Sequence, residues 1–277
     1  MGERGKGMNA QAGIEQLQRS KGAAHAGFAL SDRRICLREL HQSGSAKAIV
    51  LPGPAPEVVF LNTSGGLTGC DRLDYALTLG PGCHLTATTQ TAERIYRSPG
   101  GLAQIGVRAQ VGAGAHLDWL PQETILFDRA AARRRTEIDL APDATCLMAE
   151  TVVLGRAAMG EKVARTAFTD WRILRRGAVP LHMEVLRLCD AALRMGAAGL
   201  DGVRAVASVI LAAPGAADAL GPVRASLGMD GVRGAASAFA GRLVIRLMAA
   251  DAWPLRLQMV RLLSVLRPGP LPRVWQC

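Results

Sequence analysis

Short apolar segments that alternate with polar residues and end in turns of Gly, Pro, Asn or Ser make up most of the chain. This pattern is typical of β-strands bounded by tight turns. In the first part of the chain it predicts strands at residues 34–40, 47–51 and 57–61. Further along it predicts a hairpin of residues 166–173 and 181–187 around a turn at 176–178, and a strand at 242–247.

The middle of the chain contains a weak internal repeat. The sequence LGPGCHL at 79–85 is echoed by VGAGAHL at 111–117 and, more loosely, by LAPDATC at 140–146. Each copy combines the end of one strand, a tight turn and the start of the next strand. Self-similarity with a period of about 20–50 residues is typical of stacked coils, none of which can bury its apolar face alone. We therefore predict a β-helix-like body.

Two segments favour helix. Residues 216–227 are rich in alanine and follow the break at Pro214-Gly215, while residues 254–266 place their apolar side chains on one helical face before Pro268-Gly269. The second helix either packs on a sheet or presents that face to a partner. The predicted fold is thus mainly β, with β-helix-like stacked sheets and about two α-helices. Residues 1–27 are predicted to be a flexible leader, and residues 28–277 a single domain.

The net charge of +10 is carried almost entirely by arginine, since the chain has four lysines. Such a surface favours acidic partners. Nucleic-acid binders usually cluster their basic residues and interleave aromatics, whereas here the arginines are dispersed and the aromatic fraction is 4%. We therefore expect no nucleic-acid partner. The densest run, at 133–135, is followed by Glu137 and Asp139, and we interpret it as a solvated strand edge or a contact for an acidic protein.

The six cysteines include no C-x-x-C pair, which argues against a zinc site and against a redox dithiol. The N-terminal residues carry charge without an apolar run behind it, which argues against a secretory signal. No apolar stretch reaches the roughly 18 residues that a membrane span needs. We expect a cytoplasmic protein with reduced thiols and no membrane partner.

The chain lacks the nucleotide-binding G-x-x-x-x-G-K-[ST] loop, the G-x-S-x-G elbow and the H-E-x-x-H pair. Its most specific segment is the glycine-rich stretch 61–71, which presents Asp71 at the mouth of a polar site or is an ordinary turn. Acidic and imidazole side chains on short strands are the remaining candidates for chemistry. The alternative for each is a solvated or hydrogen-bonded strand residue; the set is Asp71, His84, His116, Asp118, Glu123, Glu150, Glu161, His182 and Glu184.

An ordered series of motifs then gives a specific resemblance. The series comprises residues 62–69 with Asp71, 88–90 with Tyr96-Arg97, 119–127, Glu150 with 154–156, Gly160-Glu161, and the ending 271–276. From about Phe28 to the C-terminus the chain resembles the family of the urease accessory protein UreD, also called UreH. Two positions depart from the family pattern. Cys70 stands where a glycine is usual, and Glu93-Arg94 replaces a small residue and a lysine.

The resemblance implies a β-helix-like fold and a non-enzymatic role. Such a protein is a urease maturation chaperone, a scaffold that binds apo-urease and recruits UreF and, through UreF, the GTPase UreG. Together they insert nickel into the urease active site in a GTP-dependent step. The resemblance also implies that no cofactor is bound permanently, and that nickel(II) is in transit through an internal, water-filled tunnel.

Carried onto this sequence, the resemblance makes Asp71, Glu150, Glu161 and Glu184 the candidate tunnel positions, with His84 as a further candidate metal ligand. None of them is expected to bind nickel tightly, because a conduit must release its ion. The segment 242–275 is the predicted partner contact. The alternative from a different class is a stand-alone β-solenoid, either metal-binding or carbohydrate-active, which rests only on the repeats and the carboxylates.

Overall fold

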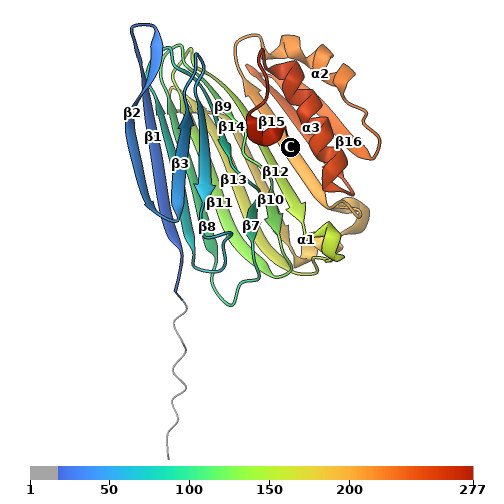
Figure 1. The fold of residues 1–277 in the computed structure, drawn as a ribbon. Helices are drawn as coiled ribbons and strands as arrows, with labels where there is room; N and C mark the ends of the chain where they lie inside the picture. Colours follow the sequence, from blue (N-terminus) through green and yellow to red (C-terminus); the bar gives the residue numbers. More distant parts are fainter. Residues whose placement is uncertain (1–17, 277) are drawn as a thin grey trace, which may run out of the picture.

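The computed structural model describes residues 18–276, in which two large β-sheets lie face to face (Figure 1). The first is a seven-stranded sheet. Its strands, in order across the sheet, are β14 (Val179–Cys189), β13 (Thr166–Arg176), β11 (Ala130–Leu140), β8 (Ala103–Val111), β5 (Arg72–Leu79), β1 (Lys21–Ser31) and β2 (Arg34–Gly44).

The second sheet of the described residues has ten strands. Its main path is β16 (Val232–Phe239), β17 (Arg242–Ala249), β15 (Ala205–Ala212), β12 (Thr145–Leu154), β9 (His116–Trp119), β6 (His84–Thr89), β4 (Glu57–Asn62) and β3 (Ala46–Leu51). Two short strands, β7 (Glu93–Ile95) and β10 (Thr124–Leu126), pair beside the end of β12 and form a narrow third face.

From β5 onward the chain winds alternately through the two sheets, so that β5, β8, β11 and β13 are parallel neighbours, as are β6, β9 and β12. The predicted repeat is confirmed, and so is the mainly β, stacked-coil fold. In each of the three repeat turns, the amide of the residue before the new strand donates to a carbonyl three positions back; these bonds are Cys83 to Gly80, Ala115 to Gly112 and Ala144 to Ala141. The paired register places His84 opposite His116 in adjacent coils.

Close stacking of the coils explains the glycine at the second repeat turn. A Cβ atom at Gly112 would lie 2.8 Å from the carbonyl oxygen of Leu79 in the coil next to it. The Gly112 amide donates to that same carbonyl at 2.8 Å. A larger residue would separate the two coils and break this bond, so glycine is needed here for the close approach.

Antiparallel hairpins close both ends of the stack. On one side, β1 pairs with β2, and β3 pairs with β4. On the other side, β14 pairs with β13 in the first sheet, and the second sheet is extended by β15, β16 and β17. β1 begins at Lys21 and lies parallel to β5. The predicted start of order at Phe28 is therefore too late, because a strand whose buried residues are small, such as Ala24 and Ala26, has little hydrophobic signature. The first part of the predicted leader, residues 1–17, lies outside the described residues.

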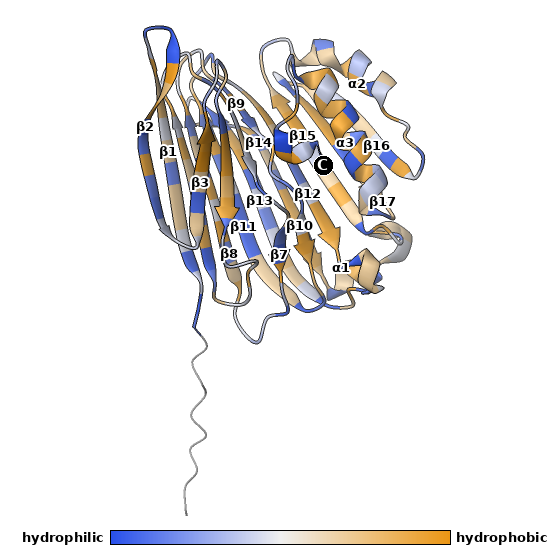
Figure 2. Ribbon diagram, in the orientation of Figure 1, coloured by the Kyte–Doolittle hydropathy of each residue, from blue (hydrophilic) through white to orange (hydrophobic). Residues whose placement is uncertain are grey.

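Helices α2 and α3 lie on the outer face of the second sheet (Figure 1). In α3, Leu255, Met259 and Leu262 are buried against β15 and β17, which confirms the predicted amphipathic helix and its packing on a sheet. β12 and β15 are covered on both faces and are hydrophobic along most of their length (Figure 2). The helices and 3-10 turns are η1 (Ala157–Met159), α1 (Asp190–Arg194), η2 (Gly196–Ala198), η3 (Ala216–Ala219), α2 (Leu220–Ser226), α3 (Ala252–Leu266) and η4 (Arg273–Trp275).

The glycine-rich segment connects β4 to β5 and is held from inside. Asp71 is 5% exposed, and its two carboxylate oxygens accept the amides of Ser20 and Thr68, each at 2.8 Å. Gly66 has φ +147°, and a Cβ there would collide with the ring of Tyr96. Cys70, next to Asp71, has φ +69°, a left-handed conformation that residues with a Cβ resist.

The backbone at Cys70 gives a first prediction. Replacing Cys70 by glycine removes the steric cost of the left-handed conformation, whereas Cys70→Ala keeps it. We expect the glycine variant to exceed the alanine variant by about 1 kcal/mol in free energy of unfolding. Urea denaturation followed by circular dichroism measures the difference, and equal stabilities of the two variants would show that the turn is not strained.

Candidate functional site

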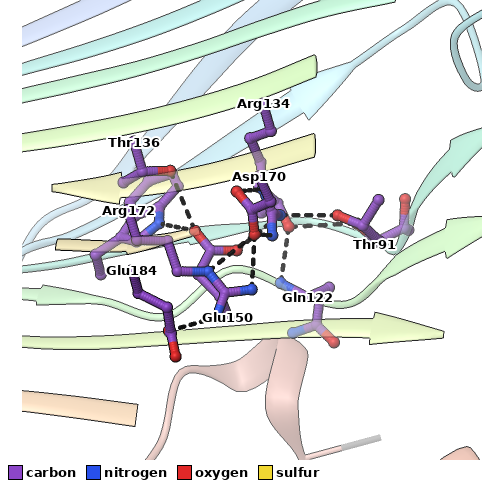
Figure 3. Close-up of polar contacts among 11 residues, drawn as sticks. Thr91, Gln122, Arg134, Thr136, Glu150, Asp170, Arg172 and Glu184 are labelled. Atoms are coloured by element: carbon purple, nitrogen blue, oxygen red, sulfur yellow. Dashed lines mark hydrogen bonds and ion pairs between the residues drawn. The ribbon is translucent and has the colours of Figure 1, made fainter. Parts of the chain in front are cut away.

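A chain of ion pairs runs through the space between the two sheets (Figure 3). At its centre Asp170 of β13 is completely buried. One carboxylate oxygen lies 2.6 Å from Nη2 of Arg134 and 2.6 Å from Nη2 of Arg172, and the other accepts Nε of Arg134 at 2.9 Å. Burial acts to raise the pKa of Asp170, but the two guanidinium groups outweigh it and hold the pKa at about 2. Asp170 is therefore ionised at neutral pH.

Glu150 of β12 extends the chain toward the second sheet. Its carboxylate lies 2.7 Å from Nη1 of Arg134, and it accepts the indole N–H of Trp119 at 2.9 Å. Glu150 is 1% exposed, and this burial raises its pKa above the ordinary value, against the opposing charge of Arg134. A buried carboxylate of this kind stays charged only while its cationic partner stays in place.

Glu184 of β14 carries the chain of ion pairs to the surface. It receives Nη1 of Arg172 at 3.0 Å and Nε of Arg246, from β17, at 2.7 Å. The side chain of Arg172 is 3% exposed and that of Arg246 is 64% exposed. Burial acts to raise the pKa of Glu184, but the two arginines lower it below its ordinary value. Alternating acidic and basic groups thus connect the interior with solvent.

On the other side of Glu150, two small cavities lead toward the glycine-rich segment. The inner one, of about 30 Å³, is bordered by Glu150, Arg134 and Trp119. The outer one, of about 50 Å³, is bordered by Asn62 and Gly66. Both are lined by Tyr75, Thr89 and Glu93, and each is large enough for at least one water molecule. These shared side chains form the boundary between the two cavities.

Glu93 of β7 is the acidic group at this boundary. The amide nitrogen of Asn62 donates to its two carboxylate oxygens at 3.1 and 3.3 Å. Within residues 18–276 it forms no ion pair. Burial raises the pKa of Glu93 to about 7, and the Asn62 hydrogen bond only partly offsets this. Glu93 is therefore divided between its protonated and charged forms near neutral pH.

A second polar cluster occupies the edge where the repeat turns lie. The rings of His84 and His116 are 6.0 Å apart, as stacking of adjacent coils predicted. His116 contacts Asp118 at 2.9 Å and the hydroxyl of Thr145 at 2.7 Å, and Asp118 accepts Nε of Arg267 at 2.7 Å. A cavity of about 340 Å³ adjoins this cluster. Asp118 is thus fully engaged by its own protein partners.

The candidate residues fall into separate groups. Glu150 and Glu184 belong to one network through Asp170 and Arg172. Asp71 directly precedes β5 and His84 begins β6, so the length of β5, roughly 25 Å, separates the two residues along the strand direction.

Glu161 lies in the loop that follows β12. Its carboxylate accepts Nε of Arg156 at 2.8 Å and the amide of Asp128 at 3.1 Å. In the described part of the chain, no three His, Cys, Asp or Glu side chains are grouped as a metal site.

Strand alternation identifies the arginines that the sequence analysis missed. Arg134 lies between the exposed Arg133 and Arg135, and it points inward with Ala132 and Thr136. The interpretation of this run as a solvated strand edge is therefore wrong for Arg134, since β11 lies inside the seven-stranded sheet. The same alternation in β13 places Asp170 and Arg172 inward. Once β11 and β13 are assigned as strands, the alternation of inward and outward side chains identifies Arg134, Asp170 and Arg172 as inward-facing.

Comparisons with known proteins show the family of the chain. The family model described as UreD urease accessory protein matches residues 20–276. A urease accessory protein UreD from Cereibacter sphaeroides is 57% identical over 264 residues, covering 94% of this chain and 96% of that protein. The protein of the same name from Paracoccus denitrificans is 53% identical, covering 94% of each chain, and that from Rhizobium etli is 47% identical, covering 93% and 96%.

The raised pKa of Glu93 predicts a pH-dependent stability. Between about pH 4.5 and pH 7 the folded chain holds a proton on Glu93 that the unfolded chain has lost, so stability falls as the pH rises through this window and stays lower above it. Glu93→Gln removes this loss and keeps the acceptor for Asn62. At pH 8 we expect the variant to be more stable than the unmodified chain by about 2 kcal/mol, and at pH 5 nearly equal.

Urea unfolding at the two pH values measures this difference. Asp143→Asn, at an exposed carboxylate in the turn before β12 that forms no ion pair within the described residues, is the control and should leave the pH dependence unchanged. If the Glu93 variant keeps the pH dependence of the unmodified chain, Glu93 is not the titrating group.

Proposed function

The chain belongs to the family of UreD urease accessory proteins, and we propose that it is a maturation chaperone that binds apo-urease and takes part in loading its active site with nickel. The proposal includes recruitment of UreF and, through UreF, of the GTPase UreG. This division of labour fits a sequence without a phosphate-binding loop, because GTP hydrolysis then belongs to the partner. The chain itself acts without catalysing a reaction.

We further propose that nickel(II) passes through the space between the sheets and is not a permanent cofactor. The supporting observation is the continuous series of polar groups that runs from the two cavities through Glu150 to Glu184 at the surface. The arginines in this series weaken the binding of cations, because each one is paired with a carboxylate that nickel would otherwise bind. Passage therefore requires an arginine to move aside for each transfer, which keeps every site weak.

Among the other candidates, Asp71, Glu161 and His84 remain proposed positions near the ends of the coils. Asp71 already holds two backbone amides and Glu161 is paired with Arg156, so each has a local structural role as well. His84 lies beside a cavity and close to His116. These three fit entry or exit positions better than the interior of a path.

The segment 242–275 is the proposed partner contact. It contains α3, on which Trp253 is 58% exposed at the rim of a cavity of about 240 Å³. Arg256, on the same helix, lies over the ring of Trp275 and reaches Glu123. An exposed tryptophan beside a polar rim is typical of a protein-binding surface.

The proposed site of action is the cytoplasm. The five cysteines in the described residues form no disulfide, which fits a reducing compartment. Within residues 18–276 no helix combines the length and hydrophobicity needed to cross a membrane.

Urease produced with and without this chain tests the chaperone proposal. Co-expression with the urease subunits and all other accessory proteins should give active, nickel-loaded urease, and omission of this chain should give urease without nickel. Metal analysis of the purified urease gives the result directly. Full nickel content in the absence of this chain would refute the proposal.

Glu150→Gln tests the proposed path separately from assembly. The substitution preserves shape and removes the interior charge, while Asp170 still holds Arg134. We expect complexes with apo-urease and UreF to form as usual, and the nickel content of urease to fall severalfold. Glu137→Gln, on the outer face of β11, is the matched control and should load nickel normally. If Glu150→Gln abolishes complex formation, or if it loads nickel as well as the control, Glu150 is structural.

A further inference from the structure

The interior carboxylates differ in how their charge is balanced. Glu150, Asp170 and Glu184 each lie within 3.0 Å of at least one arginine nitrogen. Glu93 accepts neutral donors, the side-chain amide of Asn62 and the backbone of Arg94, and forms no ion pair within the described residues. A mostly buried carboxylate without a cation is costly in its charged form. Glu93 is thus a position in this interior where an added positive charge would be stabilised.

Tyr75 supplies a second, independent observation at the same place. Its side chain is 5% exposed, and its ring stacks on Phe60 with centroids 4.5 Å apart. No hydrogen bond joins its hydroxyl to any residue in the described part of the chain. Like Glu93, Tyr75 lines both cavities, and its pKa is raised by burial and, to a smaller extent, by the charge of Glu93. A hydroxyl beside a cavity and without a protein partner is free to contact a ligand or water there.

We propose that Glu93 and Tyr75 form a weak binding site for a partly hydrated divalent cation at the boundary between the two cavities. The Glu93 carboxylate supplies the charge. The Tyr75 hydroxyl and Thr89 supply neutral oxygen contacts, directly or through water. On the proposed nickel path, this site would be one stopping point, and that role rests on the proposed function.

The chemistry of the site favours a cation that keeps part of its water. Carboxylate, hydroxyl and water are the ligands of hard or borderline divalent ions, and a single carboxylate gives weak binding. The cavities of about 30 and 50 Å³ leave room for water molecules around the ion.

The other charged groups around the site set its strength. Arg134 and Glu150 border the inner cavity, where they are paired with each other, and Arg94 borders the outer one. The cationic groups keep the affinity low. The site therefore suits an ion that stops briefly, between the surface near Asn62 and the interior near Glu150.

Manganese(II) is the probe for this site in the purified full-length chain. Its unpaired electrons broaden the NMR signals of nearby protons. We expect substoichiometric manganese to broaden the side-chain amide of Asn62 and the indole N–H of Trp119 before the indole of the exposed Trp253. Glu93→Gln should raise the manganese concentration needed by about tenfold or more, because it removes the site's only uncompensated charge. Tyr75→Phe, which keeps the ring stacked on Phe60, should raise it by about threefold.

Glu39→Gln is the control for loss of one negative charge and should behave as the unmodified chain. Unchanged broadening in Glu93→Gln, or an equal loss in Glu39→Gln, would overturn the site. Nickel loading of co-expressed urease separates this inference from the proposed function. If Glu93→Gln loses the manganese effect yet loads urease fully, the cation site stands and the proposed path through it fails. If it loads urease poorly while its manganese effect is unchanged, the cation site is overturned.

Discussion

Charges buried between the two sheets must be balanced, and this requirement shapes the centre of the molecule. Asp170 is held between Arg134 and Arg172. On either side of it, Arg134 also pairs with the carboxylate of Glu150, and Arg172 pairs with that of Glu184. Removing one member of such a set leaves an uncompensated charge and typically costs about 3–5 kcal/mol. Groups that are already balanced bind a passing ion only weakly, which fits the proposed nickel path. Glu93, which lacks such a partner, is the exception.

The stacked coils create the positions that the ion pairs occupy. Parallel pairing in register sets equivalent residues of successive strands side by side, so Arg134 of β11 lies directly opposite Asp170 of β13. Two residues further along the same strands, Thr136 lies opposite Arg172. A polar series along the stack therefore needs only one suitable residue in each coil. Repetition of the backbone thus places a connected series of polar groups between the two sheets.

The sequence predicts the repeat, the long C-terminal helix and the class of fold because each depends on local periodicity. The turns after residues 79, 111 and 140 share a glycine or proline pattern that turn geometry requires. The family resemblance, now supported by close relatives, adds a role that no local pattern contains. The start of β1 was missed since its buried face is made of alanine and glycine, whose signal differs little from that of a loop.

The candidate site was only partly predictable, because partners in an ion pair come from different coils. Glu150 and Glu184 were recognised singly, yet nothing in their spacing shows that Asp170 and Arg172 connect them. Glu93 was noted only as a departure from the family pattern. Its importance depends on the lack of an ion-pair partner within the described residues, and only the three-dimensional structure shows this.

The parallel pairing of β1 with β5 has a consequence for biosynthesis. β1 and β2 precede the other strands of the described residues, and only a two-residue turn separates them, so they can pair with each other before any of those later strands is synthesised. Each later coil then adds to an edge that already exists, from β5 through β8 and β11 to β13. From β1 to β14 the order of translation therefore matches the order of the strands across this sheet, so no later strand has to insert between two earlier ones.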